Sequence, residues 1–184
     1  MHFPDSVRNL VLVGFMGSGK SSVGREIARR WGFRFVDTDA TIRQQYRKSI
    51  PDIFAAFGEA AFRDEENKVL QDLQNSLHAV IATGGGIVLE PRNRHLLRAL
   101  GLVIWLTASE EVIWDRVSRN QNRPLLQTGN PRDTVSNLMS KRSPLYGSVA
   151  DITVETSGLT HRQVADRAVE AIRVWSTARN EDHN

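Results

Sequence analysis

The sequence contains no cysteine among its 184 residues. This absence excludes disulfide scaffolds, thiolate zinc sites and cysteine nucleophiles, and it suits a reducing compartment such as the cytoplasm. Long apolar runs are missing too. The first apolar run, Leu10 to Val13, is far too short for a signal-peptide core or a membrane span. We therefore expect a soluble, cytoplasmic protein that does not enter a membrane.

Lysine is scarce, with four lysines against twenty arginines, and the formal net charge is only +3. Arginine suits two-point recognition of phosphate and carboxylate because its guanidinium is planar. A small net charge with scattered arginines is more typical of an ordinary solvated surface than of a nucleic-acid interface, so we expect no nucleic-acid partner. The sequence also lacks internal repeats, heptad runs and linkers, which predicts one domain over 1–176 and a polar, disordered tail over 177–184.

Short apolar runs alternate with longer segments of helical period, a pattern typical of a parallel sheet with helices on both faces. The predicted strands are 9–13, 34–36, 79–82, 102–106 and 152–154. The predicted helices are 21–31, 40–46, 59–75, 91–100, 110–119, 131–146 and 160–175. The segment 120–130 is polar and irregular, which predicts a mobile lid. The sequence therefore predicts an α/β fold of three layers, α/β/α, with a five-stranded parallel sheet.

A glycine-rich loop, GFMGSGKS, follows the first predicted strand and opens the first predicted helix. It matches the phosphate-binding pattern G-x-x-x-x-G-K-[ST], in which the backbone N–H groups and the helix N-terminus surround phosphate oxygens. Lys20 is expected to contact the β and γ phosphates, and the Ser21 hydroxyl to bind Mg²⁺. The expected ATP-binding residues of this loop are Gly17, Ser18, Gly19, Lys20, Ser21 and Ser22. A plain strand-to-helix turn would need neither the lysine nor the serine.

Two carboxylates, Asp37 and Asp39, stand at the end of the second predicted strand, whose end should face the same crevice as the phosphate loop. Alternate residues of an extended chain point to one side, so both carboxylates can serve one site. We assign Asp37 to Mg²⁺ through water and Asp39 to the hydroxyl that is phosphorylated. The alternative is that one of them only caps the following helix, as Asp39 before Ala40 could.

Two further segments suit a kinase site. Three glycines, 84–86, follow the third predicted strand and leave a surface without side chains, although they could also form only a flexible turn. Arg123 lies in the predicted lid, where it could swing onto the transferring phosphate, although an isolated arginine is more often a surface residue. No N-K-x-D segment occurs, which argues against a GTP-binding switch and favours a small kinase.

Six segments together resemble the shikimate kinase family in order and spacing: GFMGSGKSSVGR, DTD at 37–39, GEAAFRDEE at 58–66, TGGG at 83–86, RPLL at 123–126 and KRSPLY at 141–146. The resemblance covers roughly residues 10–156. It implies a P-loop kinase fold, the substrates ATP and shikimate, Mg²⁺ as cofactor and a monomer. The reaction it implies is transfer of the ATP γ-phosphate to the shikimate 3-hydroxyl.

The same resemblance implies roles for single residues. It places Asp39 at the shikimate hydroxyls, Arg63 and Arg142 at the shikimate carboxylate, and the turn of Gly84 and Gly85 against the ring. It also implies that Arg116 packs on the adenine and that Arg123 contacts the transferred phosphate, so that Lys20, Asp39 and Arg123 carry the catalysis. The resemblance further implies that Glu66 orients Arg63, although an ordinary surface pair of the two is an alternative.

Some features depart from the family pattern or leave alternatives open. Asp64, beside Arg63, is an unusual residue for that position and could weaken substrate binding slightly. The segment 157–161, which should face the adenine, shows no pattern that assigns a residue there. Two other functions stay open: a related small-molecule kinase such as a gluconate kinase, and a nucleotide-binding module that has lost catalysis.

Overall fold

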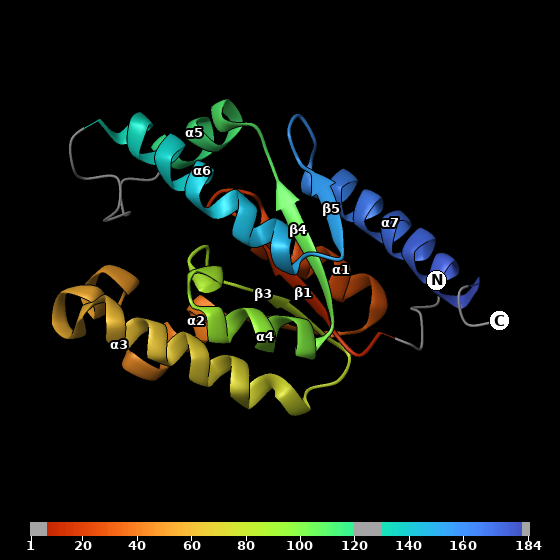
Figure 1. Cartoon of the computed structure of the whole chain (residues 1–184), viewed down its shortest axis with the longest axis horizontal. Coiled ribbons are helices and arrows are strands. Elements are labelled where there is room, and N and C mark those ends of the chain that lie inside the picture. Colours follow the sequence, from red (N-terminus) through yellow and green to blue (C-terminus); the bar gives the residue numbers. More distant parts are fainter. Residues whose placement is uncertain (1–6, 120–129, 182–184) are drawn as a thin grey trace.

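The computed structural model describes residues 7–119 and 130–181, and its strands follow the predicted alternation with helices (Figure 1). The strands are β1 (Leu10–Val13), β2 (Arg34–Asp37), β3 (Ala79–Ala82), β4 (Leu102–Thr107) and β5 (Ile152–Glu155). The α-helices are α1 (Lys20–Trp31), α2 (Thr38–Tyr46), α3 (Ile50–Asp72), α4 (Pro91–Leu100), α5 (Glu110–Ser118), α6 (Pro131–Val149) and α7 (His161–Glu181). Two short 3₁₀ helices are η1 (Leu73–Asn75) and η2 (Ile87–Leu89).

The five strands form one parallel sheet in the order β2-β3-β1-β4-β5. Strand β1 lies at its centre, so the loop that follows β1 opens between the ends of β3 and β4. Side chains that alternate along β1 enter two separate cores: Leu10 and Leu12 face one, and Val11 and Val13 face the other. Because both faces of the sheet are covered, the three inner strands β1, β3 and β4 are nearly continuous apolar runs, whereas the edge strand β5 alternates buried and exposed residues.

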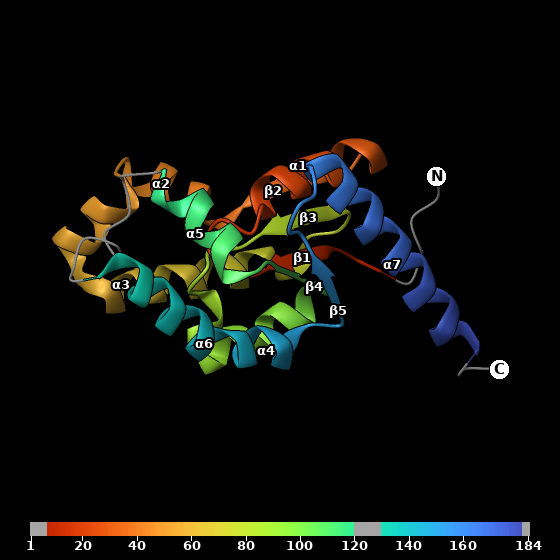
Figure 2. The same ribbon diagram turned by 90° about the horizontal axis from the view of Figure 1, so that it is seen from above.

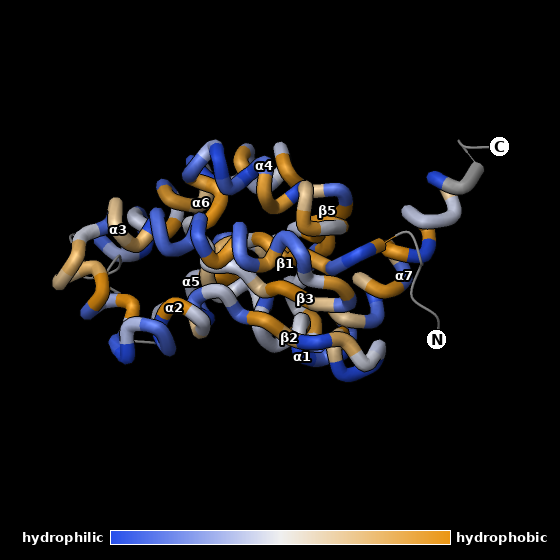
Figure 3. Tube along the Cα trace, turned by 90° about the horizontal axis from the view of Figure 1, so that it is seen from below, coloured by the Kyte–Doolittle hydropathy of each residue, from blue (hydrophilic) through white to orange (hydrophobic). Residues whose placement is uncertain are grey.

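Helices α1 and α7 pack on one face of the sheet, and α3, α4 and α6 cover the other (Figure 2). Figure 3 shows the apolar strands between the more hydrophilic outer parts of these helices. In α1 the inward side chains Val23 and Ile27 are spaced four apart, and in α7 Val164, Ala168 and Ile172 repeat the same spacing. The three-layer α/β/α prediction with a five-stranded parallel sheet is confirmed.

Two predicted helix boundaries are wrong. Helix α3 begins at Ile50 rather than at Glu59, and Gly58 interrupts it with a left-handed φ of 81°. The sequence pattern broke at this glycine, so the residues before it were not predicted as helix. Helix α7 continues to Glu181, which corrects the expectation of a disordered tail from residue 177. The predicted lid, 120–130, lies outside the described residues except for Asn130, whose side chain caps α6.

The carboxyl ends of β1, β2 and β3 meet at one edge of the sheet, beside α2 and α3 (Figure 1). The phosphate loop, Asp37 and the 84–86 turn all lie at these strand ends. Crevices at this edge are where α/β proteins bind ligands. Over the described ranges, no helix combines the length and the apolar character that a membrane crossing requires.

Candidate active site

The glycine-rich loop curls between β1 and α1 as the sequence pattern predicts. Gly17 and Gly19 have left-handed φ values of 80° and 95°, which other residues rarely adopt. Lys20, only 8% exposed, lies within this curl and donates from Nζ to the carbonyl oxygens of Gly14 and Phe15, both at 2.8 Å. The backbone N–H of Ser18 donates to Phe15 O at 3.2 Å, and the buried Ser18 hydroxyl has no hydrogen-bond partner.

Ser21 and Asp37 lie in direct contact, as expected for residues that serve one cation. The Ser21 hydroxyl donates to Oδ2 of Asp37 at 2.7 Å. The other carboxylate oxygen, Oδ1, accepts from the Ala40 backbone N–H at 3.0 Å. Asp37 therefore caps α2, which corrects the alternative that gave this role to Asp39.

Asp39 reaches the site from the first turn of α2 rather than from an extended chain. The helix starts at Thr38, so the strand alternation invoked for Asp37 and Asp39 does not apply. Asp39 is partly exposed as a residue, but its Oδ1 is buried and has no hydrogen-bond partner. Burial, followed by the nearby Asp37 carboxylate, raises the pKa of Asp39. Lys20 and Arg63 act in the opposite direction and favour its charged form.

The three glycines at 84–86 pack against the functional side chains themselves. A methyl group at Gly84 would lie 2.5 Å from Oδ1 of Asp39 and 2.9 Å from Oε1 of Glu66. At Gly86 it would lie 2.7 Å from a guanidinium nitrogen of Arg63. The Gly84 N–H donates to the Thr38 hydroxyl at 3.1 Å, which fixes the turn against α2. The turn is ordered by these contacts, and the alternative of a merely flexible turn does not account for them.

Arg63 is held by two carboxylates of its own helix. Its NH1 donates to Oε2 of Glu66 and its NH2 to Oε1 of Glu59, each at 2.7 Å. Arg63 is 8% exposed and Glu66 is fully buried, so the expected alternative of a surface pair is wrong. Burial raises the pKa of Glu66 to about 7 against the opposing effect of Arg63. The rings of Phe54 and Phe62 flank the guanidinium, with centroids 6.0 Å and 5.6 Å from its carbon.

Arg142 reaches the same turn from α6. It is 5% exposed, and its NH1 donates to Gly85 O at 3.3 Å. Its Nε is buried without a hydrogen-bond partner, and its guanidinium lies 5.7 Å from the ring centroid of Phe15. The Tyr146 hydroxyl also donates to Gly85 O, and burial raises the pKa of Tyr146 to about 12. Because Arg142 is buried beside Gly85, its guanidinium faces the 84–86 turn and not the solvent.

The unpaired polar atoms gather at this site. Among the described residues, Asp39, Glu66 and Arg142 each have a buried side-chain polar atom without a hydrogen-bond partner here, and Ser18 has another in the neighbouring phosphate loop. Buried polar groups are nearly always paired in folded proteins, and exceptions are frequent where a ligand completes the pairing. The cluster therefore marks a place where a polar ligand fits between the 84–86 turn, α2, α3 and α6.

Arg116 joins the phosphate loop to the segment that follows β5. Its NH1 donates to Gly17 O at 3.0 Å and to the Thr156 hydroxyl at 3.2 Å, and its NH2 donates to Thr156 O at 3.2 Å. The stem of Arg116 also packs near Gly17, since a methyl group there would lie 3.6 Å from Arg116 Cβ. Arg116 thus borders the phosphate loop, where a nucleotide base could pack on it.

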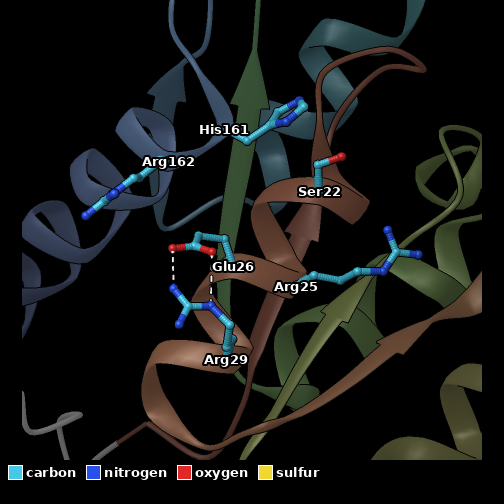
Figure 4. Close-up of a pocket in the computed structure, with 6 residues that line it drawn as sticks. All are labelled: Ser22, Arg25, Glu26, Arg29, His161 and Arg162. Carbon is cyan, nitrogen blue, oxygen red and sulfur yellow. Dashed lines mark hydrogen bonds and ion pairs between the residues drawn. The ribbon is translucent and has the colours of Figure 1, made fainter.

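An open recess of about 490 Å³ lies beside the phosphate loop, between α1 and α7 (Figure 4). Its lining residues are Ser22, Arg25, Glu26, Arg29, His161 and Arg162. Figure 4 shows Arg25 and Arg162 directed to opposite sides, and Glu26 paired with Arg29. The arginine side chains do not converge on one point, so the recess offers no second site at which several arginines could hold one anion. His161 lies close to the loop, with a ring carbon 3.6 Å from a methyl group placed at Gly19.

Asp64 lies outside the site although it follows Arg63 in the chain. It is exposed and pairs with Arg92 on the surface, so the expected weakening of substrate binding by Asp64 has no structural basis. The predicted lid residue Arg123 lies outside the described residues. Glu59 and Tyr146 lie inside the segments GEAAFRDEE and KRSPLY, but the sequence assigned neither of them a role, because their contacts with Arg63 and Gly85 depend on the folded structure. His161 lies in the segment 157–161, in which the sequence assigned no residue.

Comparison with known proteins agrees with this geometry. The family model described as shikimate kinase matches residues 16–173. A shikimate kinase of Thermodesulfovibrio yellowstonii is 43% identical over 164 residues, which cover 89% of this chain and 94% of the relative. The solved structure of shikimate kinase from Acinetobacter baumannii in complex with shikimate aligns with a TM-score of 0.88 at 38% identity, covering 92% of this chain and 95% of that one.

A more distant likeness bears on the alternative of a gluconate kinase. The crystal structure of a gluconokinase from Sinorhizobium meliloti aligns with a TM-score of 0.65 but only 19% identity, over the whole of both chains. This likeness shows a shared fold alone. The family match spans most of the chain, and the relatives are covered nearly to their full length. This chain belongs to the shikimate kinase family.

Proposed function

We propose that this chain transfers the γ-phosphate of ATP to the 3-hydroxyl of shikimate, giving shikimate 3-phosphate and ADP. The observation that carries the proposal is a set of three charged groups around a turn without side chains: the buried guanidiniums of Arg63 and Arg142, and the carboxylate of Asp39, whose Oδ1 is buried. Two guanidiniums suit one planar carboxylate, and one carboxylate suits adjacent hydroxyls. The set lies beside the phosphate loop, as transfer between two bound substrates requires.

On the nucleotide side, residues 17–22 surround the phosphates, and Lys20 exchanges its bonds to the Gly14 and Phe15 carbonyls for phosphate oxygens. The ammonium already points into the curl of the loop, which supports this exchange. Arg116 packs on the adenine and Arg123 contacts the transferred phosphate. The Arg116 side chain from α5 lies beside Gly17 of the loop, and the His161 side chain from α7 lies beside Gly19. These positions support a nucleotide held between α5 and α7.

Mg²⁺ is the expected cofactor. Ser21 and Asp37 supply hard oxygen donors at the mouth of the phosphate loop, 2.7 Å apart, and this donor set suits a cation that is shared with phosphate oxygens. When bound, Mg²⁺ neutralises phosphate charge during transfer. Asp37 also caps α2, so its carboxylate is held in place before any cation binds.

The acceptor lies on the 84–86 turn, with its carboxylate between Arg63 and Arg142 and its hydroxyls toward Asp39. Asp39 accepts the hydrogen bond of the 3-hydroxyl, orients its oxygen toward the γ-phosphorus and receives the proton as the bond to phosphorus forms. The raised pKa of Asp39 supports a carboxylate able to hold that proton. Lys20 and Arg123 offset the charge on the transferring group.

The remaining expectations belong to this proposal. We place catalysis in one domain formed by residues 1–176, with 120–130 as a lid, and we expect a monomer that acts in the cytoplasm. The absence of cysteine supports a reducing compartment. No nucleic acid or membrane is needed as a partner for this reaction.

The experiment is a coupled ADP-release assay on the purified chain with MgATP and either shikimate or gluconate. We expect ADP release with shikimate and none above background with gluconate. Release with gluconate alone would assign the acceptor to the rival kinase, whereas ATP binding without release would indicate an inactive nucleotide-binding module. Product phosphorylated at a position other than the 3-hydroxyl would contradict the placement of Asp39.

A further inference from the structure

Glu66 and Glu59 both pair with Arg63 at 2.7 Å, but their surroundings differ. The side chain of Glu59 is 61% exposed and that of Glu66 is 1% exposed. Water can therefore screen the charge of Glu59, whereas the charge of Glu66 must be balanced by its neighbours. Only one oxygen of Glu66 is paired, because Oε1 is buried and has no hydrogen-bond partner.

The charges that face Glu66 balance one another before a substrate binds. Arg63 from its own helix and Arg142 from α6 are positive, Glu66 and Asp39 from α2 are negative, and Tyr146 from α6 is neutral. Two positive and two negative charges thus share the interior of the site. An acceptor carboxylate placed between the two arginines adds one negative charge, which a buried site accommodates only at a considerable free-energy cost.

Protonation of Glu66 removes this excess charge. The unpaired Oε1 of Glu66 and the unpaired Oδ1 of Asp39 both face Gly84, 2.9 Å and 2.5 Å from the position of its missing methyl group. A proton on Oε1 would remove the charge of Glu66 and make this atom a donor on the side of Gly84 where the Asp39 oxygen also lies. Burial already raises the pKa of Glu66 to about 7, so its carboxylate can be protonated near neutral pH.

We propose that Glu66 takes up a proton from solvent when the carboxylate of the acceptor binds Arg63, so that the acceptor replaces Glu66 as the buried counter-ion. Glu66 is then a positioning residue that holds Arg63 in the empty site and releases its charge on binding. This inference rests on the proposed function, since it needs an acceptor that carries a carboxylate. The proton comes from the buffer, and no covalent bond of the acceptor changes.

The test is isothermal titration calorimetry of shikimate into the protein, in two buffers with different ionisation enthalpies and one pH unit above the pKa of Glu66, about 7. For the wild-type protein we expect uptake of about 0.5 to 1 proton per shikimate bound. Glu66→Gln should still bind shikimate with no proton uptake. Glu59→Gln is the matched control. It removes the ion pair of Arg63 with Glu59, which is also 2.7 Å long but lies on an exposed residue, so this variant should still take up the proton.

The pH dependence of shikimate binding gives a second measurement, because proton uptake and shikimate binding are thermodynamically linked. Binding that takes up a proton weakens as the pH rises, so the shikimate dissociation constant of the wild-type protein should increase by up to about tenfold per pH unit above 7, and that of Glu66→Gln should change much less. Binding without uptake by the wild-type protein, or uptake unchanged in Glu66→Gln, overturns this inference alone. Absence of shikimate binding to the wild-type protein overturns the proposed function together with it.

Discussion

Gly84 and Gly86 are close neighbours in the chain but touch different functional groups, and the same substitution at each should therefore change different kinetic constants. A methyl group at Gly84 would lie 2.5 Å from Oδ1 of Asp39, whereas ordinary contacts of this kind begin near 3.4 Å. Asp39 must move by about 1 Å to relieve the overlap in Gly84→Ala, and a misplacement of that size at a reacting group costs on the order of 100-fold in rate.

Gly86→Ala is the matched control, because its methyl group meets Arg63 instead, 2.7 Å from a guanidinium nitrogen. Steady-state kinetics with shikimate and ATP varied in turn should show kcat lowered about 100-fold in Gly84→Ala and KM for shikimate raised about tenfold in Gly86→Ala. Thermal unfolding of both variants controls for loss of the fold. A normal kcat in Gly84→Ala, or a kcat lowered as far in Gly86→Ala as in Gly84→Ala, would refute the assignment of Asp39 and Arg63.

Three other substitutions test the remaining parts of the site. Lys20→Ala should abolish turnover, because the ammonium inside the phosphate loop is lost, and near-normal kinetics would remove the phosphate-loop assignment. Asp39→Asn should cost about 2 kcal/mol or more of transition-state stabilisation, measured as kcat/KM, and a fully active variant would mean that another group takes the proton. Arg142→Ala, and likewise Arg63→Ala, should raise KM for shikimate much more than KM for ATP, so a selective loss of ATP affinity would contradict their placement at the acceptor.

Much of the fold could be predicted because the signals are local. Strand β3 lies at the predicted residues, 79–82, since an unbroken apolar run ends there at Thr83 and the glycines. Helix α3 shows the limit of such signals. Its start is capped by the Ser49 side chain, which accepts from the Asp52 N–H, but Gly58 interrupts the periodicity further along. Periodicity cannot tell a helix that ends at a glycine from one that kinks there and continues.

The site was predictable where a motif fixes the local chemistry, as for Lys20 and Ser21. The surroundings of Arg63 and Glu66 were not, because burial depends on how α3 packs against the turn and α6. The sequence shows only that the two are three residues apart, a spacing equally suited to a surface pair. The sequence also did not show which of Asp37 and Asp39 caps α2, because the cap depends on which residue begins the helix.

The 84–86 turn also bears on inhibitor design. A compound that lies on this turn contacts backbone, and the space on the side-chain side of Gly84 and Gly86 is already filled by Asp39, Glu66 and Arg63. A substitution that would push the compound away also pushes a functional group out of position. Resistance is therefore expected to arise at the rim of the site, where side chains are exposed, and compounds anchored on the turn should keep their potency longest.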